Sequence, residues 1–372
     1  MRYFERYGHG GDIWSAAAAF GGKANNILDY SANINPLGPP PHVLQALDQA
    51  LEPMIRYPDP GHRRLKQGLA ARLGVYENQL IIGNGAAECM ALLLLAERPA
   101  IAGIVEPCFS EYEKLSRKFG TEVISLQGNE EDNYRVSAEE LEGFIPKTDL
   151  CFIGHPNNPT GAVYDRMTLE RAAAAAERCG TVLAVDEAFI DFLGEGTEQS
   201  VLPLISEYAN VVIFRSLTKF YAIPGLRLGY ALAHPKRIEA MREKQVSWSV
   251  NGLALAAGEA MFCDGSNEEL QQYEAHTIRL INEERAWLSE RLREVGIRVW
   301  PSEANFLLCE IGAPWTAGTF QQALGEQGVL IRSCAMYDGL RMGHFRLAVK
   351  DRASNERLLQ CIHTVFEQGG RR

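Results

Sequence analysis

The sequence lacks the cysteine and histidine patterns of a disulfide framework or a metal site. Its eight cysteines are scattered without a CxxC pair, and its eight histidines show no ligand spacing. Several cysteines lie in apolar runs, so we expect reduced core thiols and no bound metal ion. No apolar leader opens the chain, which favours a cytoplasmic protein.

Long apolar runs and an excess of basic residues are also missing. The longest apolar stretches fall well short of the roughly 20 residues that span a bilayer. Lysine and arginine number 37 against 47 aspartates and glutamates, a net charge of −10. This balance gives no reason to expect binding to nucleic acid or to a membrane surface. An enzyme of this composition that takes an anionic substrate must gather its arginines locally.

What the sequence does contain is a repeated alternation of apolar β-branched runs and helical segments. The strand-like runs lie at residues 79–82, 101–105, 150–153, 182–185 and 211–214. Repeated strand–helix units predict an α/β fold whose mostly parallel sheet is flanked by helices on both faces.

The last hundred residues have a different pattern. Residues 268–294 predict one or two long amphipathic helices, and short strands are expected at 297–300, 306–309, 329–332 and 344–349, before a closing helix from 354. This pattern predicts a smaller α+β domain. We expect an N-terminal arm (1–45) that joins the small domain, a large domain (46–267) and a small domain (268–372).

Lys219 follows the apolar run at 211–214, which predicts a lysine at the end of a buried strand. Partial burial would lower its pKa below the usual value of about 10.4. A neutral amine can then condense with an aldehyde as a Schiff base. A lone lysine after a strand is more often a surface residue, so the prediction depends on its neighbours: Ser216 and Arg227 offer a hydroxyl and a guanidinium to a phosphate.

A second phosphate-binding candidate follows the run at 79–82. Gly83-Asn84-Gly85-Ala86-Ala87 leads from this strand into a helix. The first backbone N–H groups of a helix lack partners within it, and the helix dipole is positive there. Gly85, Ala86 and Ala87 are therefore candidates to bind a phosphate, although such junctions are common in α/β proteins.

A pyridine-type aldehyde cofactor needs further partners, and the other strand ends provide candidates. Asp186, after an apolar strand, could keep the ring nitrogen protonated. Asn158 could donate to the ring hydroxyl, and Phe109 or Tyr112 could stack on the ring. All of these follow predicted parallel strands, whose carboxyl ends form the usual ligand edge of such a sheet.

Three motifs in this order resemble the fold-type I pyridoxal-phosphate enzymes of aminotransferase class I and II. They are Asn-Asn-Pro-Thr-Gly at 157–161, Asp-Glu-Ala-Phe at 186–189 and the segment 216–230. The resemblance covers nearly the whole chain and implies pyridoxal 5'-phosphate as the cofactor. It implies Lys219 as the covalent attachment point, Asp186 at the ring nitrogen and Asn158 at the ring oxygen. It assigns Ser216 and Arg227 to the cofactor phosphate.

Tyr57, in Arg-Tyr-Pro-Asp, resembles the family tyrosine that reaches the cofactor phosphate of the neighbouring subunit. The resemblance therefore implies a homodimer with shared active sites.

Within this family, four segments are similar to the threonine-phosphate decarboxylases of cobalamin biosynthesis: residues 9–11, 30–38, 186–192 and 248–251. This resemblance implies decarboxylation of L-threonine O-3-phosphate to (R)-1-aminopropan-2-yl phosphate. A substrate with both a carboxylate and a phosphate needs more than one cation. The implied substrate contacts are His9, Gly10, Asn33, Asn158, Arg332 and Arg346.

The main alternative is a histidinol-phosphate aminotransferase. Those enzymes look very similar but typically carry Asp-Glu-Ala-Tyr, whose tyrosine hydroxyl helps to hold the ring oxygen. Phe189 occupies that position here and lacks the hydroxyl. A cofactor-sensing regulator is a further alternative, but the sequence has no basic helix-turn-helix pattern of the kind that such proteins need.

Overall fold

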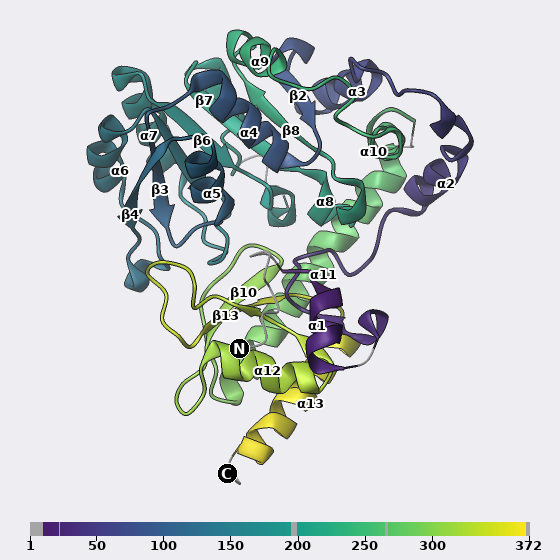
Figure 1. Cartoon of the computed structure of the whole chain (residues 1–372), viewed down its shortest axis with the longest axis vertical. Helices are drawn as coiled ribbons and strands as arrows, with labels where there is room; N and C mark the ends of the chain where they lie inside the picture. Colours follow the sequence, from purple (N-terminus) through teal and green to yellow (C-terminus); the bar gives the residue numbers. More distant parts are fainter. Residues whose placement is uncertain (1–9, 22, 195–198, 265–266, 370–372) are drawn as a thin grey trace.

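A seven-stranded sheet with the order β2-β8-β7-β6-β5-β3-β4 organises the larger part of the molecule (Figure 1). The computed structural model describes residues 10–21, 23–194, 199–264 and 267–369. Strand β8 runs antiparallel to β2 and β7, and the other neighbouring pairs are parallel, which confirms the predicted α/β sheet. The strands are β2 (Leu80–Gly83), β3 (Ile101–Glu106), β4 (Glu122–Gln127), β5 (Leu150–Gly154), β6 (Val182–Asp186), β7 (Val211–Ser216) and β8 (Gly229–Ala233).

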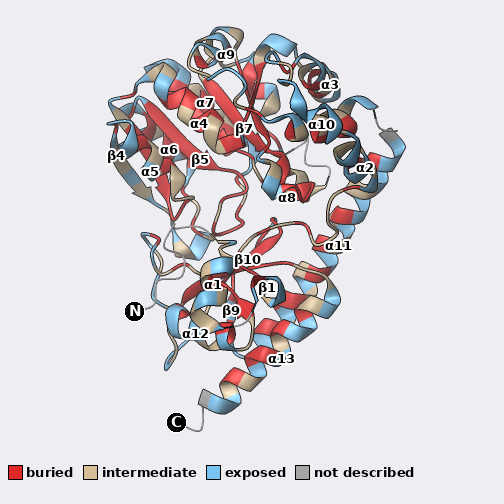
Figure 2. Ribbon diagram, turned by 45° about the vertical axis from the view of Figure 1, so that its right-hand side comes forward, coloured by how far each residue is buried: buried red, intermediate tan, exposed pale blue. Residues whose placement is uncertain are grey.

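Helices cover both faces of this sheet, because alternate side chains of its central strands point to opposite sides. Ala184 and Phe214 belong to the cluster that α4 completes, whereas Val185 and Ile213 pack in the cluster that contains α7. Figure 2 shows the buried strands between helices whose outer surfaces are exposed. The surrounding helices are α4 (Ala86–Glu97), α5 (Glu111–Lys118), α6 (Ala138–Phe144), α7 (Arg166–Cys179) and α9 (Pro235–Arg242).

A four-stranded sheet, β12-β13-β10-β9, forms the centre of the smaller part. Leu307 and Leu347 belong to the hydrophobic core that this sheet shares with its helices, while Leu308 belongs to a separate cluster that includes Tyr134 of the larger part. The two faces of the small sheet thus have different partners. Its elements are β9 (Arg298–Val299), β10 (Phe306–Glu310), β12 (Arg332–Ser333) and β13 (His344–Ala348), with α11 (Asn267–Glu294), α12 (Ala317–Glu326) and α13 (Arg352–Gly369).

Two segments link the parts. The N-terminal arm contributes β1 (Leu28–Asp29), which pairs in parallel with β11 (Val329–Leu330), and α1 (Ile13–Phe20), which contacts α12. The following helix, α2 (Pro41–Gln49), packs on α10 (Gly252–Glu259) instead. Residues 268–294 belong to one continuous helix, α11, that reaches from one part to the other (Figure 1). We retain 1–45, 46–267 and 268–372 as a proposed division.

The expectations of unpaired cysteines and of no membrane-spanning segment can be compared with the structure. All eight cysteines are reduced, and six of them are buried, whereas Cys179 and Cys263 are exposed. No helix in the described part of the chain combines the length and hydropathy that crossing a bilayer requires.

Gly229 permits a close approach that a side chain would prevent. A Cβ at this position would lie 2.5 Å from the backbone nitrogen of Ala86 and 2.8 Å from the carbonyl oxygen of Arg215. Because both atoms are backbone, we expect Gly229→Ala to force α4 away from β8. Overpacking of this kind costs roughly 1–3 kcal/mol, which urea unfolding would measure.

Gly225 provides the matched control for this substitution. A Cβ there would meet no described atom within 4 Å, so Gly225→Ala should leave the free energy of unfolding nearly unchanged. Equal unfolding free energies for the two variants would contradict the close-approach argument.

Candidate active site

Three parallel strands end side by side and bring the predicted polar residues to one edge of the large sheet. Asp186 closes β6 and lies in register with Gly154, the last residue of β5, and with Phe214 of β7. Asn158 follows β5, and Lys219 lies in the short helix α8 (Leu217–Phe220) directly after β7. The carboxyl edge expected from the sequence is therefore where these side chains gather.

Lys219 is half-buried, and the N-terminal arm holds its backbone. The N–H of Asn35 donates to the Lys219 carbonyl at 3.1 Å, and Asn35 Nδ2 donates to the carbonyl of Phe220 at 2.8 Å. Burial lowers the pKa of the Lys219 amine to about 8; the charges of Arg227 and Arg346 act in the same direction, and Asp186 opposes them. Near neutral pH, this amine has a larger neutral, nucleophilic fraction than an ordinary lysine.

Asp186 is buried and receives two hydrogen bonds. The hydroxyl of Tyr112 donates to Oδ2 at 2.7 Å, and the N–H of Ala188 donates to Oδ1 at 3.0 Å. Burial raises the pKa of Asp186 to about 6, while both hydrogen bonds and the charge of Lys219 oppose that rise. The carboxyl is thus mostly ionised at pH 7, as a partner for a protonated ring nitrogen must be.

Tyr112 and Phe109 were equivalent candidates for stacking on a ring, and the structure distinguishes them. The ring of Tyr112 stacks on Phe152, with centroids 5.0 Å apart and an interplanar angle of 5°, while its hydroxyl binds Asp186. Both parts of Tyr112 are thus engaged within the protein. Phe109 meets Tyr112 edge-on at 5.7 Å and is only partly buried, which leaves it as the stacking candidate.

The N-terminus of α4 lies against Arg227. Gly85, which precedes the helix, has φ +80°, and a Cβ there would lie 2.7 Å from Nη2 of Arg227. A side chain at this position would fill the space that the guanidinium occupies. The backbone N–H groups of Ala86 and Ala87 begin the helix beside it.

Ser216 joins this group through Gly229, its backbone partner in β8, which also packs against the amide of Ala86. Its hydroxyl is 2.8 Å from that of Thr218. Helix N–H groups, a hydroxyl and a guanidinium therefore surround one small region, and this donor set fits a phosphate group.

Arg332 and Arg346 bring two positive charges toward the same region from the small sheet. They are backbone partners on β12 and β13 and are only 1% and 6% exposed. Arg346 donates to Oδ1 of Asn158 and, at 2.6 Å, to the carbonyl oxygen of Ser31. Its guanidinium lies over the ring of Phe306, 5.4 Å from the centroid. Arg346, one of the two substrate arginines expected from the sequence, thus meets Asn158 across the two parts.

Phe189 and Asn33 complete the surroundings. Phe189 packs edge-on against Phe306, with centroids 4.9 Å apart. Asn33 is buried, and its Oδ1 has no hydrogen-bond partner among the described residues. A buried acceptor of this kind suits a ligand that carries a donor.

Three expected site residues remain: His9, Gly10 and Tyr57. His9 lies outside the described residues. Gly10 packs on Ser31, where a Cβ would come within 2.1 Å of the carbonyl oxygen, and the N–H of Gly11 donates to the Ser31 hydroxyl at 2.7 Å. Tyr57 is 81% exposed and its ring lies 4.6 Å from that of Trp248, so within one chain it faces solvent.

The sequence did not predict the supporting roles of Asn35 and Ser31. It also did not predict the hydrogen bond between Tyr112 and Asp186. A further supporting contact is a buried ion pair beneath the site, in which Nε of Arg215 and Oε2 of Glu187 are 2.7 Å apart. A signal for this pair existed, because opposite charges directly follow Asp186 and directly precede Ser216 at neighbouring strand ends. The other contacts join segments far apart in the chain and leave no local pattern.

Comparison with known proteins agrees with this geometry. The family model "Aminotransferase class I and II" matches residues 25–362. A threonine-phosphate decarboxylase of Salmonella typhimurium is 38% identical over 363 residues, covering 96% of each chain. A histidinol-phosphate aminotransferase structure from Clostridium acetobutylicum has a TM-score of 0.83 at 29% identity, over 91% of this chain and 99% of that one. An L-threonine-O-3-phosphate decarboxylase structure from Porphyromonas gingivalis has a TM-score of 0.78 at 25% identity, over 91% and 99%.

The family match spans most of the chain, the fold is that of the solved relatives, and the lysine, the carboxylate and the candidate phosphate donors expected from the sequence meet at one sheet edge. The chain belongs to the aminotransferase class I and II family of fold-type I enzymes, and its cofactor is pyridoxal 5'-phosphate.

Proposed function

We propose that the protein decarboxylates L-threonine O-3-phosphate to (R)-1-aminopropan-2-yl phosphate and carbon dioxide, for the aminopropanol arm of cobalamin, as a cytoplasmic homodimer. The observation that carries the substrate class is the pair of buried arginines, Arg332 and Arg346, on adjacent strands. Burying two guanidinium groups this close together is costly, and an anionic substrate would offset that cost. The 38% identity to a threonine-phosphate decarboxylase supports the reaction.

The described residues fit the cofactor, whose ring, when bound, supplies an acceptor for the electron pair released at the substrate Cα. In this proposal Lys219 binds the aldehyde carbon, Asp186 the ring nitrogen and Asn158 the ring oxygen, while Phe109 stacks on the ring. The phosphate is bound by Gly85, Ala86, Ala87, Ser216, Arg227 and Tyr57 of a second copy.

Two tasks fall to the protein during the reaction. Arg332 and Arg346, together with Asn33, Asn158, Gly10 and His9, would fix the carboxylate and phosphate of the substrate. Their anchoring decides whether the Cα–carboxylate bond or the Cα–H bond breaks. Asp186 would hold the proton on the ring nitrogen, and the Lys219 amine would deliver a proton to Cα after carbon dioxide leaves.

Transamination of histidinol phosphate is the second candidate, favoured by the likeness to the Clostridium acetobutylicum enzyme. The arginine pair suits this reaction as well, because a dicarboxylate co-substrate would also need two cations. Phe189 argues against it, since this side chain has no hydroxyl to hold the ring oxygen.

An assay without a keto acid separates the two reactions. We expect the cofactor-loaded protein to release carbon dioxide from L-threonine O-3-phosphate and to form one equivalent of the phosphorylated amine. Lys219→Ala should abolish this release and also the adduct that borohydride fixes on the wild-type protein. No carbon dioxide, together with glutamate formed from oxoglutarate and histidinol phosphate, would reverse the assignment.

The proposed homodimer has a surface to support it. Four exposed apolar side chains lie close together in sequence, and the ring of Tyr57 lies at a tilt of 30° to that of Trp248, which is exposed as well. Several exposed apolar side chains within one short segment are typical of protein interfaces. The four side chains are Leu51, Met54, Ile55 and Tyr57.

Ile55 is 86% exposed, so its replacement tests the interface without disturbing the core of a single chain. We expect Ile55→Glu to shift the protein to a monomer in sedimentation experiments and to weaken cofactor binding, because Tyr57 would no longer reach a second site. Met167→Glu, at another exposed apolar side chain on α7, is the control and should leave the oligomeric state unchanged. A monomeric wild-type protein with full activity would contradict the shared-site proposal.

Asp186 gives a pH prediction for the cofactor-free protein. Burial raises its pKa from 3.8 to about 6, so the folded state binds this proton more tightly than the unfolded state does. The contribution of Asp186 to the free energy of unfolding is therefore fully present below about pH 4 and is lost as the pH rises through about 6. Asp186→Asn does not titrate and should be more stable than wild type by about 3 kcal/mol at pH 8 and by roughly half as much at pH 5.

Urea unfolding at the two pH values measures this difference. The same variant should bind pyridoxal phosphate more weakly, because a neutral amide cannot stabilise a protonated ring nitrogen. An advantage that stays constant between pH 5 and pH 8 would show that Asp186 has an ordinary pKa in the fold.

A further inference from the structure

The turn after β4 contains backbone strain that the cofactor site does not explain. Asn133 and Tyr134 have φ of +55° and +60°, in the left-handed region, which asparagine adopts more readily than other non-glycine residues and a bulky tyrosine rarely adopts. The turn also closes against Gly128, where a Cβ would lie 2.1 Å from the carbonyl oxygen of Tyr134. A strained backbone conformation persists only where the surrounding contacts stabilise it, and such positions are often functional.

What the turn presents is the side chain of Tyr134. This ring is 3% exposed and belongs to a cluster whose other members all come from the small domain: Trp300, Leu308, Cys334 and Tyr337. Its hydroxyl lies 3.0 Å from Nε2 of His344 on β13. A side chain from the large domain is thus packed into the face of the small sheet.

The other ring nitrogen of His344 is held by the backbone of Arg341. The N–H of Arg341 lies 3.0 Å from Nδ1 and its carbonyl oxygen lies 3.2 Å from the same atom. Burial lowers the pKa of His344 and raises that of Tyr134 to about 12, so both groups are neutral. The bond between Tyr134 and Nε2 therefore joins two neutral groups, and either of them can be the donor, according to the tautomer of His344.

His344 lies two residues before Arg346, and alternate residues of a strand share a face. Both side chains meet the large domain, His344 at Tyr134 and Arg346 at Asn158. We propose that Tyr134 is a positioning residue for substrate binding: by holding His344, it fixes β13 against the large domain and so fixes the guanidinium of Arg346. This inference rests on the substrate role of Arg346 proposed above.

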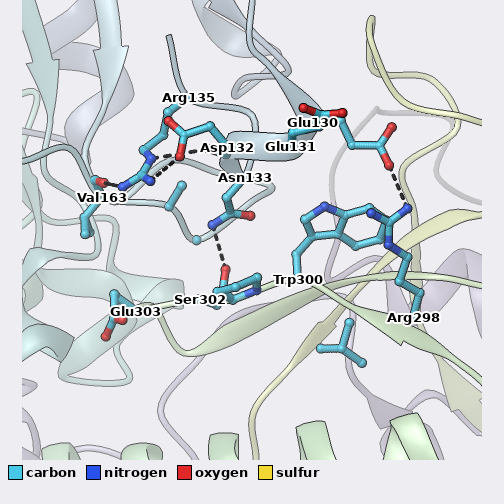
Figure 3. A pocket seen from close by; sticks show the side chains of 14 residues that line it. Glu130, Glu131, Asp132, Asn133, Arg135, Val163, Arg298, Trp300, Ser302 and Glu303 are labelled. Atoms are coloured by element: carbon cyan, nitrogen blue, oxygen red, sulfur yellow. Dashed lines mark hydrogen bonds and ion pairs between the residues drawn. The ribbon is translucent and has the colours of Figure 1, made fainter. Parts of the chain in front are cut away.

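Tyr134 is one of several contacts between the two parts in this region. Close to it in the chain, Glu130 and Asn133 line a cavity of about 420 Å³ together with Arg298 and Trp300 (Figure 3). Exposed ion pairs join Glu130 to Arg298 and Arg341, and such pairs contribute little in water. Two backbone carbonyls also accept hydrogen bonds across the two parts, Pro301 from Asn133 Nδ2 and Gly161 from the N–H of Glu303. Tyr134 differs from these contacts because it is a buried side chain that binds a side chain of β13.

Tyr134→Phe tests this role because it keeps the ring and removes the hydroxyl. We expect the KM for L-threonine O-3-phosphate to rise three- to tenfold, as for the loss of one buried hydrogen bond, with kcat within twofold. The affinity for pyridoxal phosphate should not change, since its proposed ligands lie on the large domain. A purely structural residue would not separate KM from kcat and from cofactor affinity in this way.

Tyr164→Phe is the matched control. Tyr164 is also buried in the large domain, and its hydroxyl accepts only a long bond, 3.5 Å, from the N–H of Val136. This bond does not involve β13, so its loss should leave KM unchanged. Equal KM values for the two variants, or a parallel loss of cofactor affinity in Tyr134→Phe, would overturn the inference.

A second measurement does not depend on the substrate. Hydrogen exchange of the resting, cofactor-loaded protein should be faster in residues 344–348 of Tyr134→Phe than in wild type or Tyr164→Phe. Unchanged exchange would overturn the inference. A wild-type protein that releases no carbon dioxide from L-threonine O-3-phosphate would instead refute the proposed function, and the exchange comparison would still report on the contact between Tyr134 and β13.

Discussion

The structure depends on the burial of two opposite charges, Lys219 and Asp186, at the carboxyl edge of a parallel sheet. Removing charged groups from water is costly, and neighbouring groups reduce that cost. Tyr112 and the N–H of Ala188 support the carboxylate, while Asn35 holds the backbone on which the lysine lies. The resulting pKa values, about 8 for the amine and about 6 for the carboxyl, are closer together than those of the free side chains. Both groups can therefore take part in proton transfer near neutral pH.

The arginines of this acidic protein are also placed where neighbouring groups reduce the cost of burying a charge. Arg215 is a buried residue of β7 and is paired with Glu187, so it joins the ends of β6 and β7. Arg227 lies at a helix N-terminus, where Gly85 leaves room for it. Arg332 and Arg346 come from the small sheet, and Arg346 meets the arm and Asn158. The site is thus assembled from stretches that are far apart in the chain, and its positive charge is local although the net charge is negative.

Much of this arrangement follows from the sequence because parallel strands end at a common edge. The alternation of strands and helices predicted the sheet, and Lys219, Asp186 and Asn158 were predicted from their places after strands. Contacts between residues far apart in the chain leave no recognisable pattern in the sequence. Tyr112 and Phe109 were equivalent from the sequence, and only the three-dimensional structure brings the Tyr112 hydroxyl to Asp186. The reversed strand β8 and the role of Ser31, which joins the arm to Arg346, likewise depend on contacts between distant residues. The roles of the individual site residues remain predictions.

The continuous helix α11 has a mechanical consequence. Near its start, the Tyr273 hydroxyl lies 2.8 Å from the carbonyl oxygen of Gly38 and 3.1 Å from that of Phe220, next to Lys219. Further along, Arg285 donates to the carbonyl of Ala304, beside the small sheet. At 1.5 Å per residue, its 28 residues form a rod about 42 Å long. Because this helix is continuous and is hydrogen-bonded at both places, a tilt of the small sheet would move the backbone next to Lys219 as well.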